Sequence, residues 1–130
     1  MSKPDCCSIC GASLHHPLAS YCRRCKRLVD RSSPKKKADK AARARALQKA
    51  WDDKIKGFRC CYSGVLLNEC DRTDPRYLTF DHRTPRQEDD IVITAQLIND
   101  MKTDMTDKEF REMVFQLARR FNGREFDERL

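Results

Sequence analysis

The sequence predicts a small α+β protein, and three features along its 130 residues support that prediction. Two Cys-x-x-Cys pairs lie near the N-terminus, an Ala-, Lys- and Arg-rich stretch follows them, and strand-forming residues then precede two helical patterns. Because the composition changes after residues 33 and 57, we expect three parts. These are a cysteine module over 1–33, a basic connecting helix over 34–57 and an α+β domain over 58–130.

The net charge of the chain indicates what kind of partner it would bind. The chain has 27 Lys and Arg against 20 Asp and Glu, a net charge of +7. Such a balance suits a polyanion, and nucleic acid is the leading candidate. The first residues lack the apolar core of a signal peptide, and no run of about 18 apolar residues follows. We therefore expect a cytoplasmic protein without a membrane span, whose eight cysteines are metal ligands and buried thiols rather than disulfides.

The cysteine module has the spacing of a structural zinc site. Cys7 with Cys10 and Cys22 with Cys25 form two Cys-x-x-Cys turns, and each turn can aim two thiolates at one ion. The segment has few apolar residues, so a zinc ribbon stabilised by metal, worth about 10 kcal/mol or more, is the expected structure. Cys6 could instead replace Cys7, His15 or His16 could replace a thiolate, or the cysteines could form a redox dithiol pair. A catalytic zinc is disfavoured because four thiolates leave no open position.

The connecting helix is expected to begin at Pro34 and to end at Gly57, residue types that favour those positions. Leu47, Trp51 and Ile55 recur every four residues and should face the core. The other faces are basic, so the helix is either a solvated spacer or lies along a phosphate backbone. We favour the second, because its acidic residues are few and mostly late. The cationic candidates are Lys35, Lys36, Lys37, Lys40, Arg43 and Arg45.

The α+β domain should begin with a strand and turn over 58–68, tightest at Ser63-Gly64, followed by a charged loop over 69–76. The run from Tyr77 to Pro85 is typical of a strand, and Asp81 and His82 lie near its end. An apolar run from Ile91 to Ile93 precedes a helical stretch over 97–102 that contains Asn99. Three further cysteines in this domain are expected to be buried or free thiols rather than ligands: Cys60, Cys61 and Cys70.

A last helix is predicted from Thr106 to Asn122. Thr106 and Glu109 have the spacing of a capping box, and Gly123 can end the helix. Its apolar residues repeat with the spacing of one buried face, which we expect to be core. They are Phe110, Met113, Val114, Leu117 and Phe121.

The stretch from Phe58 to Phe110 resembles the HNH endonucleases, whose ββα-metal fold places a hairpin and a helix around one metal ion. The matching segments are 61–67, Thr79-Phe80-Asp81-His82, Ile91-Val92-Ile93, Asn99 with Lys102, and 104–106 leading to Phe110. The resemblance implies that Asp81 and Asn99 are metal ligands and that His82 is the general base. The family usually has an asparagine where this chain has Asp90, so we expect Asp90 to support the loop, with metal ligation as the alternative.

The residues are chemically suited to that role. A neutral His82 can accept a proton from water near pH 7, and the oxygen atoms of Asp81 and Asn99 suit Mg²⁺ or Mn²⁺. Lys102, Arg83 and Arg86 could contact a phosphate, although the two arginines could equally be solvated charges. Taken alone, Asp81 and His82 could also be an ordinary hydrogen-bonded pair.

The sequence therefore predicts a metal-dependent endonuclease acting on double-stranded DNA, with a structural zinc and a catalytic Mg²⁺ or Mn²⁺. One site per chain predicts nicking of one strand, and the resemblance implies 5′-phosphate and 3′-hydroxyl ends. Two different functions are also compatible with the sequence: a non-catalytic zinc protein that binds nucleic acid, or an adaptor whose zinc module binds protein. The sequence leaves the oligomeric state open.

Overall fold

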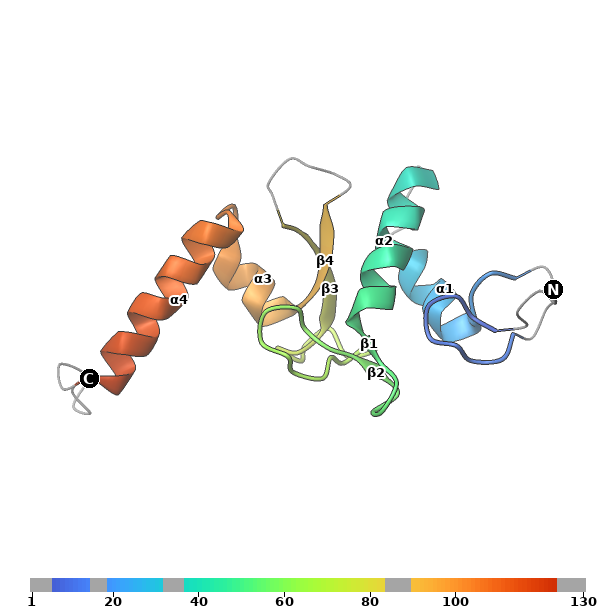
Figure 1. The fold of residues 1–130 in the computed structure, drawn as a ribbon, viewed down its shortest axis with the longest axis horizontal. Helices are drawn as coiled ribbons and strands as arrows, with labels where there is room; N and C mark the ends of the chain where they lie inside the picture. The colour runs from blue at the N-terminus through green and yellow to red at the C-terminus, as the bar shows by residue number, and fades with distance from the viewer. Residues whose placement is uncertain (1–5, 15–18, 32–36, 84–89, 124–130) are drawn as a thin grey trace.

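The computed structural model describes residues 6–14, 19–31, 37–83 and 90–123. Figure 1 shows a hairpin in the middle of an elongated molecule, with helices on both sides of it. Among the described helices, none combines the length and apolar character needed to cross a membrane. The mixed α+β class is confirmed. The elements are α1 (Arg23–Val29), α2 (Lys37–Ala50), β1 (Trp51–Asp52), β2 (Gly57–Phe58), β3 (Leu78–His82), β4 (Ile91–Ala95), α3 (Gln96–Lys102) and α4 (Asp107–Asn122).

The cysteine module is a turn followed by a helix. An antiparallel bridge joins Cys6 to Ser13, and between them Gly11 has a φ of +77°, which glycine adopts without steric strain. Cys22 is the N-cap of α1, and its sulfur accepts a hydrogen bond from the Cys25 backbone N–H. We expected a zinc ribbon. The second cysteine pair instead begins a helix, where free N–H groups need acceptors.

The basic helix is shorter than predicted, because α2 ends at Ala50. Trp51 lies in β1, opposite Phe58 of β2, and the two rings meet edge to face with centroids 5.1 Å apart. Gly57 is therefore a strand residue instead of a helix cap. Ile55 lies in the connecting turn and is 38% exposed, so its predicted packing on the core is wrong. The packing of Trp51 on Phe58 favours a β1–β2 hairpin here over the longer helix that the four-residue repeat predicts.

The β3–β4 hairpin is the centre of the domain. Its register places Leu78 opposite Ala95 and His82 opposite Ile91. The strand expected within 77–85 is confirmed, but its partner strand is β4, and the segment 58–68 reaches it through a parallel bridge between Asn68 and Tyr77. That segment forms its own turn, bridged between Arg59 and Leu66, with Gly64 at a φ of +74°. The branched apolar residues of β4 make the better strand, because they suit a pleated, buried surface.

Different helices cover the two faces of this hairpin. Side chains alternate along a strand, so Leu78 and Asp81 point to opposite faces. Leu78 and Ile93 are buried in one cluster with Leu47 of α2. On the other face lies α3, because the Lys102 ammonium contacts the Asp81 carboxylate. The core therefore lies between the hairpin and α2, and the polar face lies beneath α3.

The last helix has the predicted bounds and capping box, in which Thr106 and Glu109 each bond the other's backbone. Its predicted burial is wrong beyond the first turn. Phe110 is 3% exposed, whereas Leu117 is 38% and Phe121 is 58% exposed. Figure 1 shows the reason: α4 extends away from the rest of the molecule, so only its beginning reaches the domain.

Candidate functional site

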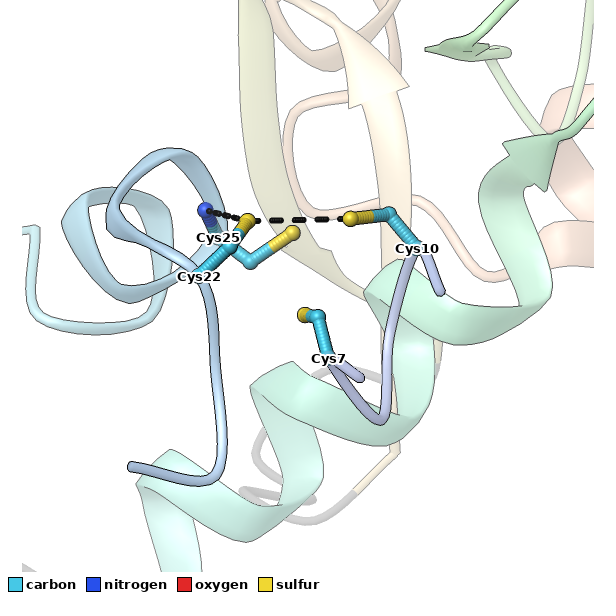
Figure 2. Close-up of side chains that lie close together, drawn as sticks. All are labelled: Cys7, Cys10, Cys22 and Cys25. Atoms are coloured by element: carbon cyan, nitrogen blue, oxygen red, sulfur yellow. Dashed lines mark hydrogen bonds between the residues drawn. The ribbon is translucent and has the colours of Figure 1, made fainter. Parts of the chain in front are cut away.

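The four predicted cysteines converge on one point. Their sulfur atoms all lie within 4.8 Å of one another, and the Cys10 and Cys22 sulfurs are 3.6 Å apart. Figure 2 shows all four side chains directed into a common space. A tetrahedral zinc with bonds of about 2.3 Å needs sulfurs roughly 3.8 Å apart. This arrangement can hold a metal ion and fits a closed structural zinc site.

Local backbone geometry creates this convergence. The Gly11 N–H donates to the Cys7 carbonyl over 2.9 Å, and the Cys7 N–H donates to the Ala12 carbonyl over 2.7 Å. These bonds close the first turn. Cys6, considered above in place of Cys7, is exposed and does not belong to the cluster. His15 and His16, considered in place of a thiolate, lie outside the described residues.

The thiols differ in acidity for physical reasons. Burial raises the pKa of Cys7, but backbone N–H donors at Cys10, Cys22 and Ile9 outweigh it and bring the value to about 7. Burial raises the pKa of Cys10, and it raises that of Cys25 far above the ordinary range. A bound cation would instead lower the pKa of the buried thiols, because metal coordination deprotonates them.

Asp81 and His82 lie at the end of β3, next to a buried lysine. The Lys102 side chain is 1% exposed, and its ammonium lies 3.2 Å from Oδ2 of Asp81. It also donates to the carbonyls of His82, over 2.9 Å, and Arg83, over 3.4 Å. The His82 residue itself is exposed. The ammonium thus neutralises Asp81, and the phosphate contact expected of Lys102 would require it to leave these oxygens.

Asn99 lies one helical turn from Lys102 on α3. It lines a cavity of about 440 Å³ together with Thr79 and three arginines. Asp81 and His82 are not among the residues lining that cavity. The structure therefore brings Asp81 together with Lys102, and Asn99 together with the arginines. Metal ligation by Asp81 and Asn99 stays a prediction.

The end of the β3–β4 hairpin at Arg83 contacts the start of α4. The Arg83 N–H donates to the Asp90 backbone carbonyl over 2.8 Å, a bond that does not involve the Asp90 side chain, so the supporting role of Asp90 stays a prediction. The Arg83 guanidinium lies 3.4 Å from the Asp107 carboxylate, which also accepts a hydrogen bond from Tyr62. Arg83 is therefore partly engaged within the protein, and Asp107 at the start of α4 is its partner.

The cationic candidates on and near α2 differ in placement. Lys40 and Arg45 are exposed, and Lys40 lies 3.4 Å from Asp30. The Arg43 guanidinium instead turns inward and donates to the backbone carbonyls of Val29 and Arg31. The remaining candidates fall outside the described residues or have undescribed side chains: Lys35, Lys36, Lys37 and Arg86.

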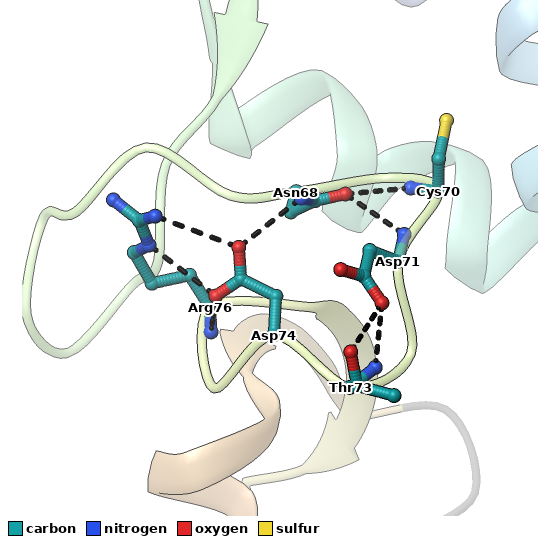
Figure 3. A network of polar contacts seen from close by, with 6 residues as sticks. All are labelled: Asn68, Cys70, Asp71, Thr73, Asp74 and Arg76. Atoms are coloured by element: carbon teal, nitrogen blue, oxygen red, sulfur yellow. Dashed lines mark hydrogen bonds and ion pairs between the residues drawn. The ribbon is translucent and has the colours of Figure 1, made fainter.

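Sequence reasoning missed two arginines in the cavity that Asn99 lines, Arg31 and Arg72. Arg31 follows α1, and Arg72 lies in the loop before β3. Figure 3 shows that this loop is ordered by side chains that bind its own backbone. Asn68 accepts the N–H groups of Cys70 and Asp71, each over 2.9 Å. No local signal identifies the two arginines, because their proximity depends on the tertiary fold.

The cysteines outside the cluster are free thiols, as expected. Cys60 is buried, whereas Cys61 and Cys70 are exposed, so burial is confirmed only for the first.

Comparisons of this chain with protein-family models, characterised proteins and solved structures gave no match.

Proposed function

We propose that this protein is a metal-dependent DNA endonuclease of the HNH type. The observation that best supports this proposal is the set of residues at and near the β3–β4 hairpin. An aspartate and a histidine end β3, and α3, which carries Asn99, contacts both strands. The net charge of +7 favours a polyanionic substrate.

The donor set is suited to a hard divalent cation. Oδ2 of Asp81 is buried and accepts no regular hydrogen bond from the described residues, and the Lys102 ammonium lies 3.2 Å from it. A divalent cation would have to compete with that ammonium for Oδ2, and the neutral amide oxygen of Asn99 would add a second ligand of the type that Mg²⁺ and Mn²⁺ prefer. A bound divalent ion would supply positive charge to the scissile phosphate and to the departing oxygen.

The remaining chemistry belongs to the chain. His82 is exposed at the strand end, where its imidazole can meet water and take its proton. A base of this kind contributes about 10²–10⁴-fold to the rate. The exposed cations Lys40 and Arg45 of α2 would hold the DNA backbone, and that binding would weaken steeply with salt through counterion release.

One observation favours a second candidate, a non-catalytic zinc protein that binds nucleic acid. The Lys102 ammonium already lies 3.2 Å from Asp81 and needs no metal to neutralise it. If that ion pair is permanent, Asp81 is a structural residue. No observation on the described residues favours the adaptor hypothesis, which predicts no affinity for DNA even at low salt.

A plasmid assay separates these functions. Supercoiled plasmid is incubated with the zinc-loaded protein and Mg²⁺ or Mn²⁺, with and without chelator, and nicks are tested for sealing by DNA ligase. We expect ligatable nicks that need the added metal, and their loss in His82→Ala and Asp81→Asn with DNA affinity retained. Asp104→Asn, an exposed aspartate beyond α3, is the matched control. Binding without nicks under any metal would favour the second candidate.

A further inference from the structure

A cavity at the outer edge of β3 gathers positive charge from three separate segments. It has a volume of about 440 Å³, and its polar lining comes from residues after α1, on α2, in the loop before β3, on β3 and on α3. We call it the arginine cavity. Its polar lining residues are Arg31, Arg43, Arg72, Thr79, Gln96 and Asn99.

Two of the arginines are held rigidly by neutral groups. Arg31 donates to the Leu78 carbonyl and lies 4.6 Å from the centre of the Tyr77 ring. Arg43 donates to the Val29 carbonyl over 3.1 Å and lies 4.7 Å from the centre of the Phe80 ring. Carbonyls and rings orient a guanidinium but leave its charge uncompensated. Both side chains are thus positioned in advance, with little rotamer freedom left to lose on binding.

The described residues place no carboxylate in ion-pair contact with these guanidiniums. Glu69, whose charge acts on Arg31, is itself bound by Arg24 through two hydrogen bonds, one of them 2.7 Å long. Burial lowers the pKa of the Arg31 guanidinium, and the charges of Arg72 and Arg43 lower it further, against the opposing effects of Tyr77 and Glu69. Three like charges around one partly desolvated space raise the free energy of the protein unless an anion relieves it.

The donors of the cavity match a tetrahedral oxyanion. Each guanidinium has five N–H groups in a planar fork, and the bonds of Arg43 to described residues all use Nη1. The Asn99 amide adds further N–H donors at the same cavity. Arginine is favoured over lysine wherever phosphate is bound through paired N–H donors.

We infer that the arginine cavity binds a phosphate group. That group could belong to a nucleic-acid strand or to a small phosphate ester, and the chemistry of recognition is the same for both. The inference goes beyond the proposed cleavage activity and does not require it, because His82 does not line the cavity.

The test uses the zinc-loaded full chain and measures thermal unfolding and affinity for inorganic phosphate, against chloride at equal ionic strength. Arg72→Gln is the probe, because Arg72 is exposed and its loss should leave the fold intact. Arg76→Gln is the matched control, an exposed arginine in the same loop that does not line the cavity. We expect phosphate to stabilise the wild type, and Arg72→Gln to weaken phosphate binding about tenfold, the loss of one charged hydrogen bond. Arg76→Gln should change the affinity for phosphate by less than about twofold.

A second arm identifies the source of the phosphate group. If it is a strand, Arg72→Gln weakens binding of a DNA duplex more than Arg76→Gln does and lowers the salt slope by about 0.9. If it is a small ester, Arg72→Gln weakens binding of a nucleoside monophosphate and leaves duplex binding unchanged. His82→Ala should bind phosphate like the wild type even if cleavage is lost. The inference is overturned if phosphate stabilises no more than chloride, or if the two arginine variants behave alike.

Discussion

Lys102 and Asp81 form a buried ion pair, with the ammonium nitrogen 3.2 Å from a carboxylate oxygen and the lysine side chain 1% exposed. The ammonium also binds two backbone carbonyls at the end of β3. One cation therefore fixes α3 against the hairpin. It does so at the carboxylate that the proposed nuclease would use for metal, which links the stability of the fold to the chemistry of the site.

Removing the ammonium should destabilise the protein strongly. Lys102→Met leaves Asp81 charged in a nearly buried site, which typically costs about 3–5 kcal/mol. Lys108→Met is the matched control, because Lys108 is exposed on α4, and it should change stability by less than about 0.5 kcal/mol. Denaturant unfolding of the zinc-loaded protein measures both. The double variant Asp81→Asn with Lys102→Met should recover part of the lost stability. Equal stability of Lys102→Met and Lys108→Met would contradict the buried ion pair.

Zinc should be held by the four clustered cysteines alone. We expect one ion per chain after dialysis, lost in Cys10→Ser and retained in Cys70→Ser, since Cys70 is exposed and outside the cluster. Structural zinc contributes about 10–16 kcal/mol in zinc-finger peptides, so its loss should unfold the module and expose Leu28 and Val29. Metal analysis and circular dichroism test this, and a Cys10→Ser protein that keeps its zinc would show another ligand set.

Local patterns predicted a good part of this structure. The spacing of Cys7, Cys10, Cys22 and Cys25 was sufficient to predict their cluster, because its members are near each other in sequence. The capping box at Thr106 was likewise confirmed, because an N-cap depends on only four residues. Both features are determined by short-range geometry, which is what a single sequence reveals.

Features that depend on tertiary contact were missed. The pairing of Trp51 with Phe58 ended α2 early, although the helical repeat continued to Ile55. Lys102 was expected to contact a phosphate and its burial was not foreseen, because a lysine is almost never buried without a partner and the partner is 21 residues away in the chain. The arginine cavity needs several segments at once. In each case the deciding neighbour is distant in sequence.

Because much of α4 is exposed, two phenylalanine substitutions on this helix should differ in their effect on stability. Phe110→Ala should lower stability by about 3–5 kcal/mol, because Phe110 is buried and its ring meets Tyr62 edge to face at 5.4 Å. Phe115→Ala, five residues later on the same helix, should change stability by less than about 0.5 kcal/mol, since Phe115 is 65% exposed. Urea unfolding of both variants is the measurement. A large loss in Phe115→Ala would mean that α4 is covered in solution.

The loop before β3 should make the protein sensitive to acid. The Arg76 backbone N–H donates to the Asp74 carboxylate over 2.8 Å, and this bond, together with those from the Arg76 and Asn68 side chains, lowers the pKa of Asp74 below 3.8. Because the native pKa lies below the unfolded one, the charged carboxylate stabilises the folded state above the unfolded pKa. That contribution is lost as the pH falls through the lower native value.

Asp74→Asn should therefore be less stable than the wild type at neutral pH, and its stability should fall less steeply as the pH drops below the ordinary pKa of an aspartate. Asp104→Asn controls for general changes in charge and for acid release of zinc, because Asp104 is an exposed aspartate outside this network. Urea unfolding of the three proteins at each pH gives the comparison. Identical acid profiles for Asp74→Asn and Asp104→Asn would show that Asp74 does not stabilise the loop through its charge.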